Sequence, residues 1–345
     1  MGMNSLIVVG AGYAGALAAH RAASRGLEVT LVNEGDALVD RIRLHEVIAG
    51  TRAPERARRS LASMPVRLIV GRADHVGDGV VRLSSGETVA ADHLLLATGS
   101  TGGVGSWSWA QTHRRAVEAL GAGASVRVLG AGLTGIETVT ELAGSRSDLR
   151  LGLVDPRGVG ADLSDPARDY LDAVLDRLRV EFCTALADRP ADHIIDCTGF
   201  TTDTLARDSG LSVDDRGRIL VGDDLRVPGH DRLWACGDAA AVEGQPFLRW
   251  ACASAGPMGA HAADNIVRAS HGRPTEPVNI GFVAKALSLG RRDGLLDWAG
   301  RDDTPKGHVW SGRKAAYAKE LVCRFAVAAP LRWPRSYRWM KGPHD

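Results

Sequence analysis

The same glycine motif occurs twice in this chain, and it constrains the fold more than any other feature. Residues 5–35 read SLIVVGAGYAGALAAHRAASRGLEVTLVNEG, and residues 125–158 repeat the pattern as SVRVLGAGLTGIETVTELAGSRSDLRLGLVDPRG. Each copy begins with an apolar run typical of a buried strand, turns through G-x-G-x-x-G, continues as an Ala-rich helical stretch and ends in a second apolar run. The repeat therefore predicts two βαβ units that each bind a dinucleotide.

The three glycines of each motif have different tasks. The first allows a tight turn, the second lets the backbone approach a pyrophosphate, and the third lets the helix pack against the strand. The phosphates are expected at a helix N-terminus, where free N–H groups favour negative charge. The predicted cofactor-binding glycines are Gly10, Gly12 and Gly15 in the first copy and Gly130, Gly132 and Gly135 in the second.

A polar side chain at the end of each second strand is expected to bond the ribose hydroxyls. In the second copy this residue is Asp155, which favours NADH because a carboxylate repels the 2′-phosphate of NADPH. Arg157, two residues later, leaves NADPH open as an alternative. In the first copy the position is Asn33 and the next residue is Glu34, so either the amide or the following carboxylate is expected to bond the ribose.

A second repeated segment follows each unit, as DHLLLATGS at 92–100 and DHIIDCTGF at 192–200. Both predict a buried strand that ends in Thr-Gly, so Thr98 and Gly99 are expected close to a cofactor. From the first motif glycine to this threonine is 88 residues in the first copy and 68 in the second. The second unit therefore lacks about 20 residues, which correspond to a β-hairpin or meander predicted for residues 70–92.

Composition excludes several classes of protein. The chain is 45% apolar with a net charge of +1, so nothing in the whole-chain charge favours a nucleic-acid partner, and none is expected. The five cysteines are widely spaced and form neither CxxC nor CxxxxC, so no metal site and no dithiol pair is predicted. The chain has no signal-peptide pattern and no window of ~18 apolar residues, which favours a reducing cytoplasm. Only five of its 42 basic residues are Lys, a bias typical of GC-rich bacterial genes.

With these motifs the chain resembles the two-dinucleotide flavoproteins of the pyridine nucleotide-disulfide oxidoreductase superfamily. Within it, the resemblance is to the branch of type II NADH dehydrogenases and apoptosis-inducing-factor-like oxidoreductases. It covers about residues 5–295 and rests on GAGYAG, LLLATGS, GAGLTGIE and, most specifically, RLWACGDAA at 232–240. It implies an α/β fold with two Rossmann-like domains, the first for FAD and the second for NAD(P)H, with NADH preferred. It also implies that Gly237 and Asp238 complete the flavin site and that Ala73 contacts the cofactor; the alternative for Asp238 is a turn or helix-capping residue.

The resemblance further implies a chain order in which the FAD domain is split by an inserted, shortened NAD(P) domain. Residues 248–266 resemble the helix whose N-terminal end faces the flavin, with an ordinary core helix as the alternative. Glu137 resembles a residue near the nicotinamide and is otherwise a helix-start carboxylate. The expected ranges are 1–118 and 201–275 for the two parts of the FAD domain, 119–200 for the NAD(P) domain and 276–345 for a small C-terminal interface or tail segment.

The stretch that carries CxxxxC in the disulfide enzymes of this superfamily is LVDRIRLHEVIAG at 38–50 here, and it contains no cysteine. The resemblance therefore excludes glutathione- and thioredoxin-reductase chemistry, and it puts Arg41, Arg43 and His45 near the flavin. Arg41 and His45 are the predicted catalytic residues, since a cation there favours reduced flavin and His45 can donate a proton to an acceptor. The alternative is that these residues form a solvated face with Glu46.

The C-terminal segment differs from the rest in charge. Residues 305–345 carry a net charge of +7 and six of the 17 aromatic residues, while residues 1–304 carry −6. A helix is expected over 313–329, ended by Pro330 and Pro334. The segment either contacts an anionic membrane surface peripherally or docks on the acidic remainder of the protein. The side chains expected to share one side of this helix are Tyr317, Leu321, Val322 and Phe325.

These features predict an FAD-dependent NAD(P)H oxidoreductase that passes hydride from nicotinamide to flavin and electrons on to a quinone-like acceptor, without a redox-active disulfide. One alternative is an FAD-dependent oxidase or dehydrogenase of an organic substrate, as in secondary metabolism, with a vestigial nucleotide site in the shortened domain. Another is a redox-sensing flavoprotein whose basic tail binds a partner or nucleic acid. The expected location is the cytoplasm, with any peripheral contact on the inner face of the membrane. The sequence does not indicate an oligomeric state.

Overall fold

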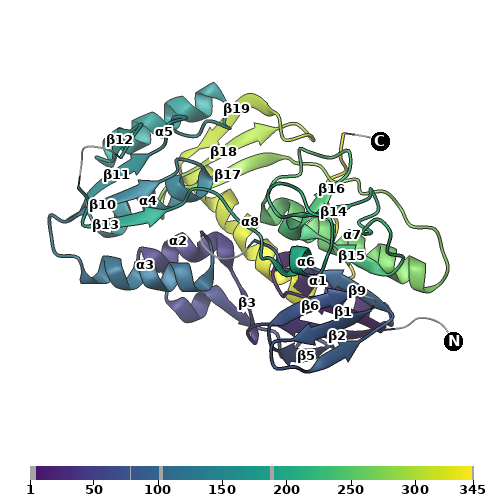
Figure 1. Ribbon diagram of the computed structural model, residues 1–345. Helices are drawn as coiled ribbons and strands as arrows, with labels where there is room; N and C mark the ends of the chain where they lie inside the picture. The colour runs from purple at the N-terminus through teal and green to yellow at the C-terminus, as the bar shows by residue number, and fades with distance from the viewer. Residues whose placement is uncertain (1–4, 78, 101–103, 187–189, 344–345) are drawn as a thin grey trace.

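The computed structural model describes residues 5–77, 79–100, 104–186 and 190–343. In Figure 1 its two larger parallel sheets lie on opposite sides of the molecule, and the long helix α8 (Gly312–Arg332) crosses the middle of this view. No helix of the described residues has the length and apolar character needed to cross a membrane.

The first sheet contains five parallel strands in the order β15-β9-β1-β2-β5. Its central strands are apolar almost throughout because helices or loops cover both faces of a parallel sheet. Helix α1 (Tyr13–Ala23) follows the first glycine turn and packs on α7 (Cys252–Ser270). The strands are β1 (Ser5–Val9), β2 (Glu28–Asn33), β5 (Arg67–Val70), β9 (His93–Leu96) and β15 (Leu233–Ala235).

The second sheet repeats this arrangement with four parallel strands in the order β12-β11-β10-β13. The match extends to single hydrogen bonds, since the Gly10 amide donates to the Val32 carbonyl at 2.8 Å and the Gly130 amide donates to the Val154 carbonyl at 2.7 Å. Two parallel Rossmann-like sheets confirm the predicted α/β class. The elements are β10 (Ser125–Leu129), α4 (Leu133–Ser145), β11 (Arg150–Val154), α5 (Asp165–Arg177), β12 (Glu181–Cys183) and β13 (His193–Asp196), preceded by α3 (Trp107–Ala119).

The difference in length between the two units also has a clear structural origin. Residues 70–92 of the first unit form the antiparallel meander β6 (Ala73–Gly77), β7 (Val80–Leu83) and β8 (Thr88–Ala90), as predicted. Between β12 and β13 of the second unit, the described residues contain no strand. The second unit is therefore the shorter because it lacks a meander there.

Short elements after β2 and around β15 bring polar side chains to the carboxyl ends of the first sheet. Between β2 and β5 the chain forms a two-stranded ribbon and three short helical segments. These elements are β3 (Ala37–Val39), η1 (Arg41–Arg43), α2 (Leu44–Ile48), η2 (Pro54–Ala57), β4 (Arg58–Ser60), α6 (Leu205–Asp208), β14 (Ile219–Val221), η3 (Gly237–Ala239) and β16 (Ala240–Val242).

The C-terminal segment forms an antiparallel sheet of β17 (Ala284–Ser288), β18 (Gly294–Ala299) and β19 (Pro305–Ser311), followed by α8. The sequence predicted the helix over 313–329, whereas α8 continues through Pro330 to Arg332. A proline in the last turn removes only one late helical hydrogen bond, and the Pro330 carbonyl accepts a bond from the His20 ring at 2.8 Å. The strand β19 was not predicted, because its Lys, Gly and His residues do not form a recognisable apolar pattern.

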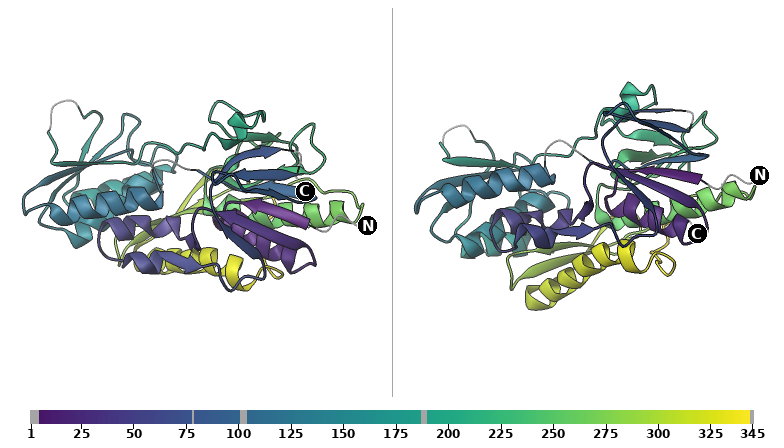
Figure 2. Two further views of the ribbon diagram at one scale, coloured as in Figure 1. Left: turned by 60° about the horizontal axis from the view of Figure 1, so that its bottom comes forward. Right: turned by 90° about the horizontal axis from the view of Figure 1, so that it is seen from below.

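Helix α8 docks on the body of the protein. The docked face is not the apolar and aromatic side that the sequence pattern indicates. Its buried residues include Ala315, Cys323 and Val327. In both views of Figure 2 the helix lies at the lower edge of the molecule, so its other face meets solvent. The exposed side chains there are Tyr317, Leu321, Val322 and Phe325, which are between 46% and 68% exposed.

Candidate active site

Both glycine turns open into one cavity of about 690 Å³ at the carboxyl ends of the two sheets. This is where ligands bind in open α/β sheets. The first turn contributes Gly12 and Tyr13, and the second contributes Gly132 and Leu133. The third side of the cavity comes from the start of α7 and from Lys319 of α8. A ligand bound at one turn would therefore meet a ligand bound at the other.

Two glycines in each motif are required by packing within the fold. Gly10 and Gly130 have φ values of +100° and +90°, and a Cβ on either would press on the backbone that follows the neighbouring strand. A Cβ on Gly15 or Gly135 would collide with the carbonyl oxygen of the first glycine of its own motif. Gly10 and Gly130 thus form the tight turns, and Gly15 and Gly135 let each helix pack closely on its strand; of the four only Gly130 also lines the cavity.

The middle glycine of each motif is different, because it leaves space instead of filling it. A Cβ on Gly12 or Gly132 would meet no atom within 4 Å beyond its immediate neighbours in the chain, and both residues line the cavity. Helices α1 and α4 begin at the next residue, so their free N–H groups point toward this space. The two open positions match the room that a pyrophosphate needs at a helix N-terminus.

The predicted ribose-binding side chains lie beside their turns. The Asn33 amide oxygen accepts from the Ala11 amide at 2.9 Å, and an Asp155 carboxylate oxygen accepts from the Ala131 amide at 2.9 Å. Glu34, the alternative to Asn33, points to solvent and pairs with Arg72 at 3.1 Å. The structure therefore brings the amide, not the carboxylate, to the first turn.

The remaining predicted contacts of the first unit lie at different distances from the cavity. Gly99 lines the cavity. Thr98 is the residue before Gly99 in the loop that follows β9, and it is not part of the cavity wall. Ala73 begins the meander strand β6 and is not part of the cavity wall.

Asp238 and Arg41 are two half-buried charged residues in the cavity wall. The Ser100 hydroxyl donates to one Asp238 carboxylate oxygen at 3.1 Å, and the other oxygen, Oδ1, is buried with no hydrogen-bond partner among the described residues. Burial raises the pKa of Asp238, and Arg41 partly offsets this. Asp238 lies inside η3 and caps no helix. A ligand hydroxyl would satisfy its free oxygen, which fits the sugar-alcohol chain of FAD.

Arg41 is held in place by the loop that follows β9. Its guanidinium donates to the Ser100 carbonyl at 2.7 Å. Burial lowers the pKa of Arg41, while the Asp238 carboxylate opposes that shift. Arg41 therefore supplies a fixed cation at the cavity.

The N-terminal end of α7 faces the same cavity, as expected for this helix. Ala251, Cys252 and Ala253 all line the wall. The helix begins at Cys252 and has 19 residues, so its free N–H groups give this part of the wall a positive potential. Close packing on α1 holds it there, because a Cβ on Gly259 would collide with the backbone of Ala14.

A buried group of three ionisable side chains lies beneath the second turn. The Lys319 ammonium is 3.1 Å from a Glu137 carboxylate oxygen, and His45 Nδ1 is 4.0 Å from the other oxygen. The His45 Nε2 atom is buried without a partner in the described part of the chain. Burial lowers the pKa of His45, and the neighbouring Glu137 only partly opposes this, so the ring is neutral near pH 7. Burial alone would lower the pKa of Lys319, but the Glu137 carboxylate together with Cys323 and Cys252 outweighs it, so the pKa is raised.

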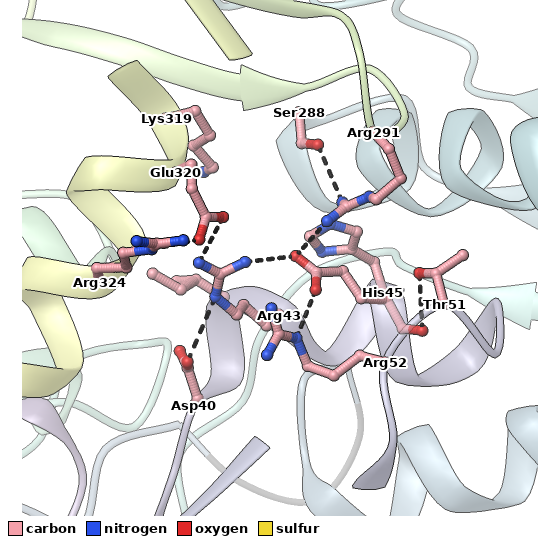
Figure 3. Close-up of polar contacts among 12 residues, drawn as sticks. Asp40, Arg43, His45, Thr51, Arg52, Ser288, Arg291, Lys319, Glu320 and Arg324 are labelled. Carbon is pink, nitrogen blue, oxygen red and sulfur yellow. Dashed lines mark hydrogen bonds and ion pairs between the residues drawn. The ribbon is translucent and has the colours of Figure 1, made fainter. Parts of the chain in front are cut away.

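Arg43 and Glu46 do not form a solvated face, because both side chains are buried. Figure 3 shows Arg43 between Asp40 and Glu320 of α8. Its guanidinium nitrogens lie 3.6 Å from an Asp40 carboxylate oxygen and 2.7 Å from a Glu320 carboxylate oxygen. Burial tends to raise the pKa of Glu46, but His45, Arg291 and Arg43 lower it to about 2. This network ties α2 to α8 and to the turn before β18, and it supports the wall that carries His45. Arg43 itself does not line the cofactor cavity.

Sequence reasoning missed Lys319, which was counted only as part of the basic tail. The available signal was its spacing, since Ala315, Lys319, Cys323 and Val327 recur every four residues and share one face of α8. A lysine between small and apolar residues on that face indicates a buried ammonium with a carboxylate partner. The aromatic stripe on the opposite face was the stronger pattern and marked the exposed side.

Comparisons with known proteins agree with this geometry. The family model for pyridine nucleotide-disulphide oxidoreductases matches residues 4–187 and 183–265. An NADH dehydrogenase-like protein of Mycobacterium tuberculosis is 28% identical, and the match covers 97% of this chain and 96% of that protein. Human ferroptosis suppressor protein 1 is 25% identical, over 84% of this chain and 87% of its own length.

Solved structures share the fold at low sequence identity. The sulfide:quinone oxidoreductase of Aquifex aeolicus has a TM-score of 0.78 and 15% identity, covering 95% of this chain and 91% of that chain. NDH2 from Plasmodium falciparum, in complex with NADH, has a TM-score of 0.75 and 12% identity, covering 97% and 99%. The chain belongs to the pyridine nucleotide-disulphide oxidoreductase family, as an FAD-dependent oxidoreductase of its type II NADH dehydrogenase-like branch.

Proposed function

We propose that this protein oxidises NADH and passes the electrons through FAD to a quinone-like acceptor, without a redox-active disulfide. The observation that carries the proposal is the single cavity lined by both glycine turns and by the buried group His45, Glu137 and Lys319. One cavity of this kind lets two dinucleotides meet and gives the reaction charge and protons at the meeting point.

We assign FAD to the first glycine turn and NADH to the second. The unpartnered Asp238 oxygen supports FAD at the first turn, as does β15, which returns late in the chain to pair with β9 of the same sheet. Asp155 supports NADH over NADPH, because its carboxylate would repel a 2′-phosphate. Arg157 pairs with Asp155 at 3.3 Å, which reduces its ability to attract that phosphate. This assignment corresponds to FAD in 1–118 and 201–275 and NAD(P)H in 119–200.

FAD, when bound, supplies the hydride acceptor for NADH and the electron donor for the second substrate. The chain's own residues supply orientation and charge. Arg41, the α7 N-terminus and Lys319 present positive charge to the cavity, which favours a negatively charged reduced cofactor. His45 is neutral near pH 7, so its unpartnered Nε2 can take up a proton and then donate it to the acceptor, and reduction of a quinone to a quinol consumes two protons.

The wall next to α8 suits a planar, apolar acceptor. Small side chains from two segments lie there together with Val322, namely Ala253 of α7 and Ala284 and Ala286 of β17. Lys319 is the charged group of this wall, and it can stabilise oxygen atoms that gain negative charge. The similarity to a sulfide:quinone oxidoreductase supports a quinone-like acceptor.

The cysteines support electron transfer without a dithiol. Cys197, Cys236 and Cys252 reach the cavity, each from a different segment. Burial raises the pKa of Cys252, and it raises those of Cys197 and Cys236 to about 12. Neutral thiols are poor nucleophiles, so these residues are unsuited to disulfide exchange near pH 7.

We also propose a peripheral contact with the inner face of the membrane through α8. The helix docks on the protein by one face, and its opposite face exposes Tyr317, Leu321 and Phe325. An exposed row of large apolar side chains is typical of an interaction surface. A lipid-soluble quinone would then enter next to the helix that also carries Lys319.

The test of the proposed function is steady-state oxidation of NADH with a short-chain, water-soluble quinone. We expect turnover that depends on both substrates and is much slower with NADPH. An oxidase with a vestigial nucleotide site would instead reduce its flavin only with an organic substrate, and a redox sensor would bind NADH without sustained turnover. Either result would replace the proposal.

A further inference from the structure

A second cavity, of about 750 Å³, lies beside α8 and is rich in arginine. Its walls are α8 and the segment from η1 to β4, which are far apart in sequence. We call it the arginine groove. The charged side chains that line it are Arg43, Arg52, Arg56, Arg59, Arg324, Arg332, Asp40 and Glu320.

The two carboxylates of the groove already have partners inside the protein. Asp40 accepts from the Tyr13 hydroxyl at 2.8 Å and lies 3.6 Å from Arg43. Glu320 accepts from Arg43 and from Arg324, each at 2.7 Å. The acidic groups therefore do not neutralise the rest of the groove.

Three arginines of the groove have a positive charge that no carboxylate of the described residues neutralises. Within the described ranges, Arg56, Arg59 and Arg332 form no ion pair with a carboxylate. Arg56 and Arg332 are exposed and Arg59 is half-buried, so their guanidinium groups can reach a bound ligand. Guanidinium groups bind phosphate oxygens in pairs of parallel hydrogen bonds, which suits them to an anion of that kind.

The rim of the groove is apolar and aromatic. Leu321, Phe325 and Trp333 line it and are each close to half exposed. The Phe325 and Trp333 rings stack with centroids 6.4 Å apart. A ligand that fits both the rim and the groove must combine a negatively charged group with an apolar part.

We propose that the arginine groove binds the phosphate headgroup of an acidic phospholipid while the rim residues contact the acyl chains of the bilayer. Basic residues beside aromatic ones are typical of the headgroup region of a membrane. The inference deepens the proposed peripheral contact and rests on it. Because Lys319 and Val322 of the same helix line the cofactor cavity, lipid in the groove would hold the acceptor side of that cavity at the bilayer surface.

The experiment measures sedimentation of the FAD-loaded full chain with vesicles of phosphatidylcholine alone and of phosphatidylcholine with phosphatidylglycerol. We expect strong binding only to the acidic vesicles. The double variant R56Q/R59Q should lower the partition coefficient by about 10- to 30-fold, as expected for two lost basic contacts. The variant R115Q/R207Q removes the same charge from two exposed arginines outside the groove and should bind like the parent.

Three outcomes would overturn the inference. Equal binding to both kinds of vesicle would remove the role of the phosphate charge. An equal loss in both double variants would show an effect of net charge alone. Binding of a single-stranded oligonucleotide that depends on Arg56 and Arg59, with vesicle binding unchanged, would assign the groove to nucleic acid. Because no NADH or quinone is present, the readout is independent of whether the proposed reaction occurs, and FAD content checks that each variant is folded.

Discussion

The Lys319–Glu137 ion pair is the residue-level feature on which the proposed chemistry most depends. The two side chains come from parts of the chain far apart in sequence and meet in the wall of the cofactor cavity. Burying an ion pair is costly, and breaking one by removing a partner is costlier still. We therefore attribute this ion pair in the cavity wall to its effect on bound ligands, whose negative charge the Lys319 ammonium can stabilise.

Replacement of Lys319 by Met should therefore lower kcat by about 10- to 100-fold, because the cation that stabilises the acceptor is lost. Lys319→Arg should restore part of the rate. The measurement is steady-state NADH oxidation with a soluble quinone, together with FAD content. Lys314→Met changes an exposed lysine on the same helix and is the matched control. An unchanged kcat in Lys319→Met would remove this residue from the reaction.

His45 leads to a prediction about pH. Since burial lowers its pKa below the ordinary value of 6.5, the ring should be neutral from about pH 6.5 upward, and it should gain a proton only at lower pH. If His45 donates the proton, the charged ring is the active form, so we expect a kcat that is constant above pH 6.5 and rises in more acidic solution as the ring charges. His45→Gln should have a lower kcat and lack this acidic rise. A variant with the parent's pH profile would contradict a role for His45 in proton transfer.

At the scale of elements, the two glycine turns offer a direct comparison. A Cβ on Gly12 or Gly132 meets nothing in the protein but enters the space kept for a cofactor, and neither residue has a positive φ. Gly12→Ala should lower the FAD content with little loss of stability, whereas Gly132→Ala should keep FAD and raise KM for NADH by about 10-fold or more. Absorbance of the purified variants and their NADH kinetics measure both effects. Loss of FAD in Gly132→Ala with a raised KM for NADH in Gly12→Ala would instead assign NADH to the first turn and FAD to the second.

The repeated motif made these elements predictable, whereas in the C-terminal segment the sequence predicted the helix α8 but not the antiparallel sheet before it. Glycine spacing and apolar strands are local signals, so both βαβ units and the missing meander could be inferred from sequence. The partners of Lys319 and Arg43 depend on how α8 packs against segments about 180 and 280 residues away, and no local pattern encodes that contact. The same limit applies to the orientation of α8, because an apolar stripe on a helix does not reveal whether protein, lipid or solvent covers it.

For the whole molecule, the near-zero net charge combines a tail of +7 with a body of −6. Part of the tail's charge is used inside the protein, as in the bonds from Lys319 to Glu137 and to the Ala286 carbonyl. Other basic groups of the tail, such as Arg332, remain at the surface beside exposed aromatic rings. The tail is thus both an interface within the protein and a surface available to a partner.

If NADH and FAD meet in the one cavity, NADH must reduce the bound flavin, and an anaerobic absorbance spectrum detects that reduction. The purified protein should show the bands of oxidised flavin, lose them on addition of NADH and regain them when a soluble quinone is added. A flavin spectrum that stays oxidised after NADH is added would contradict the account.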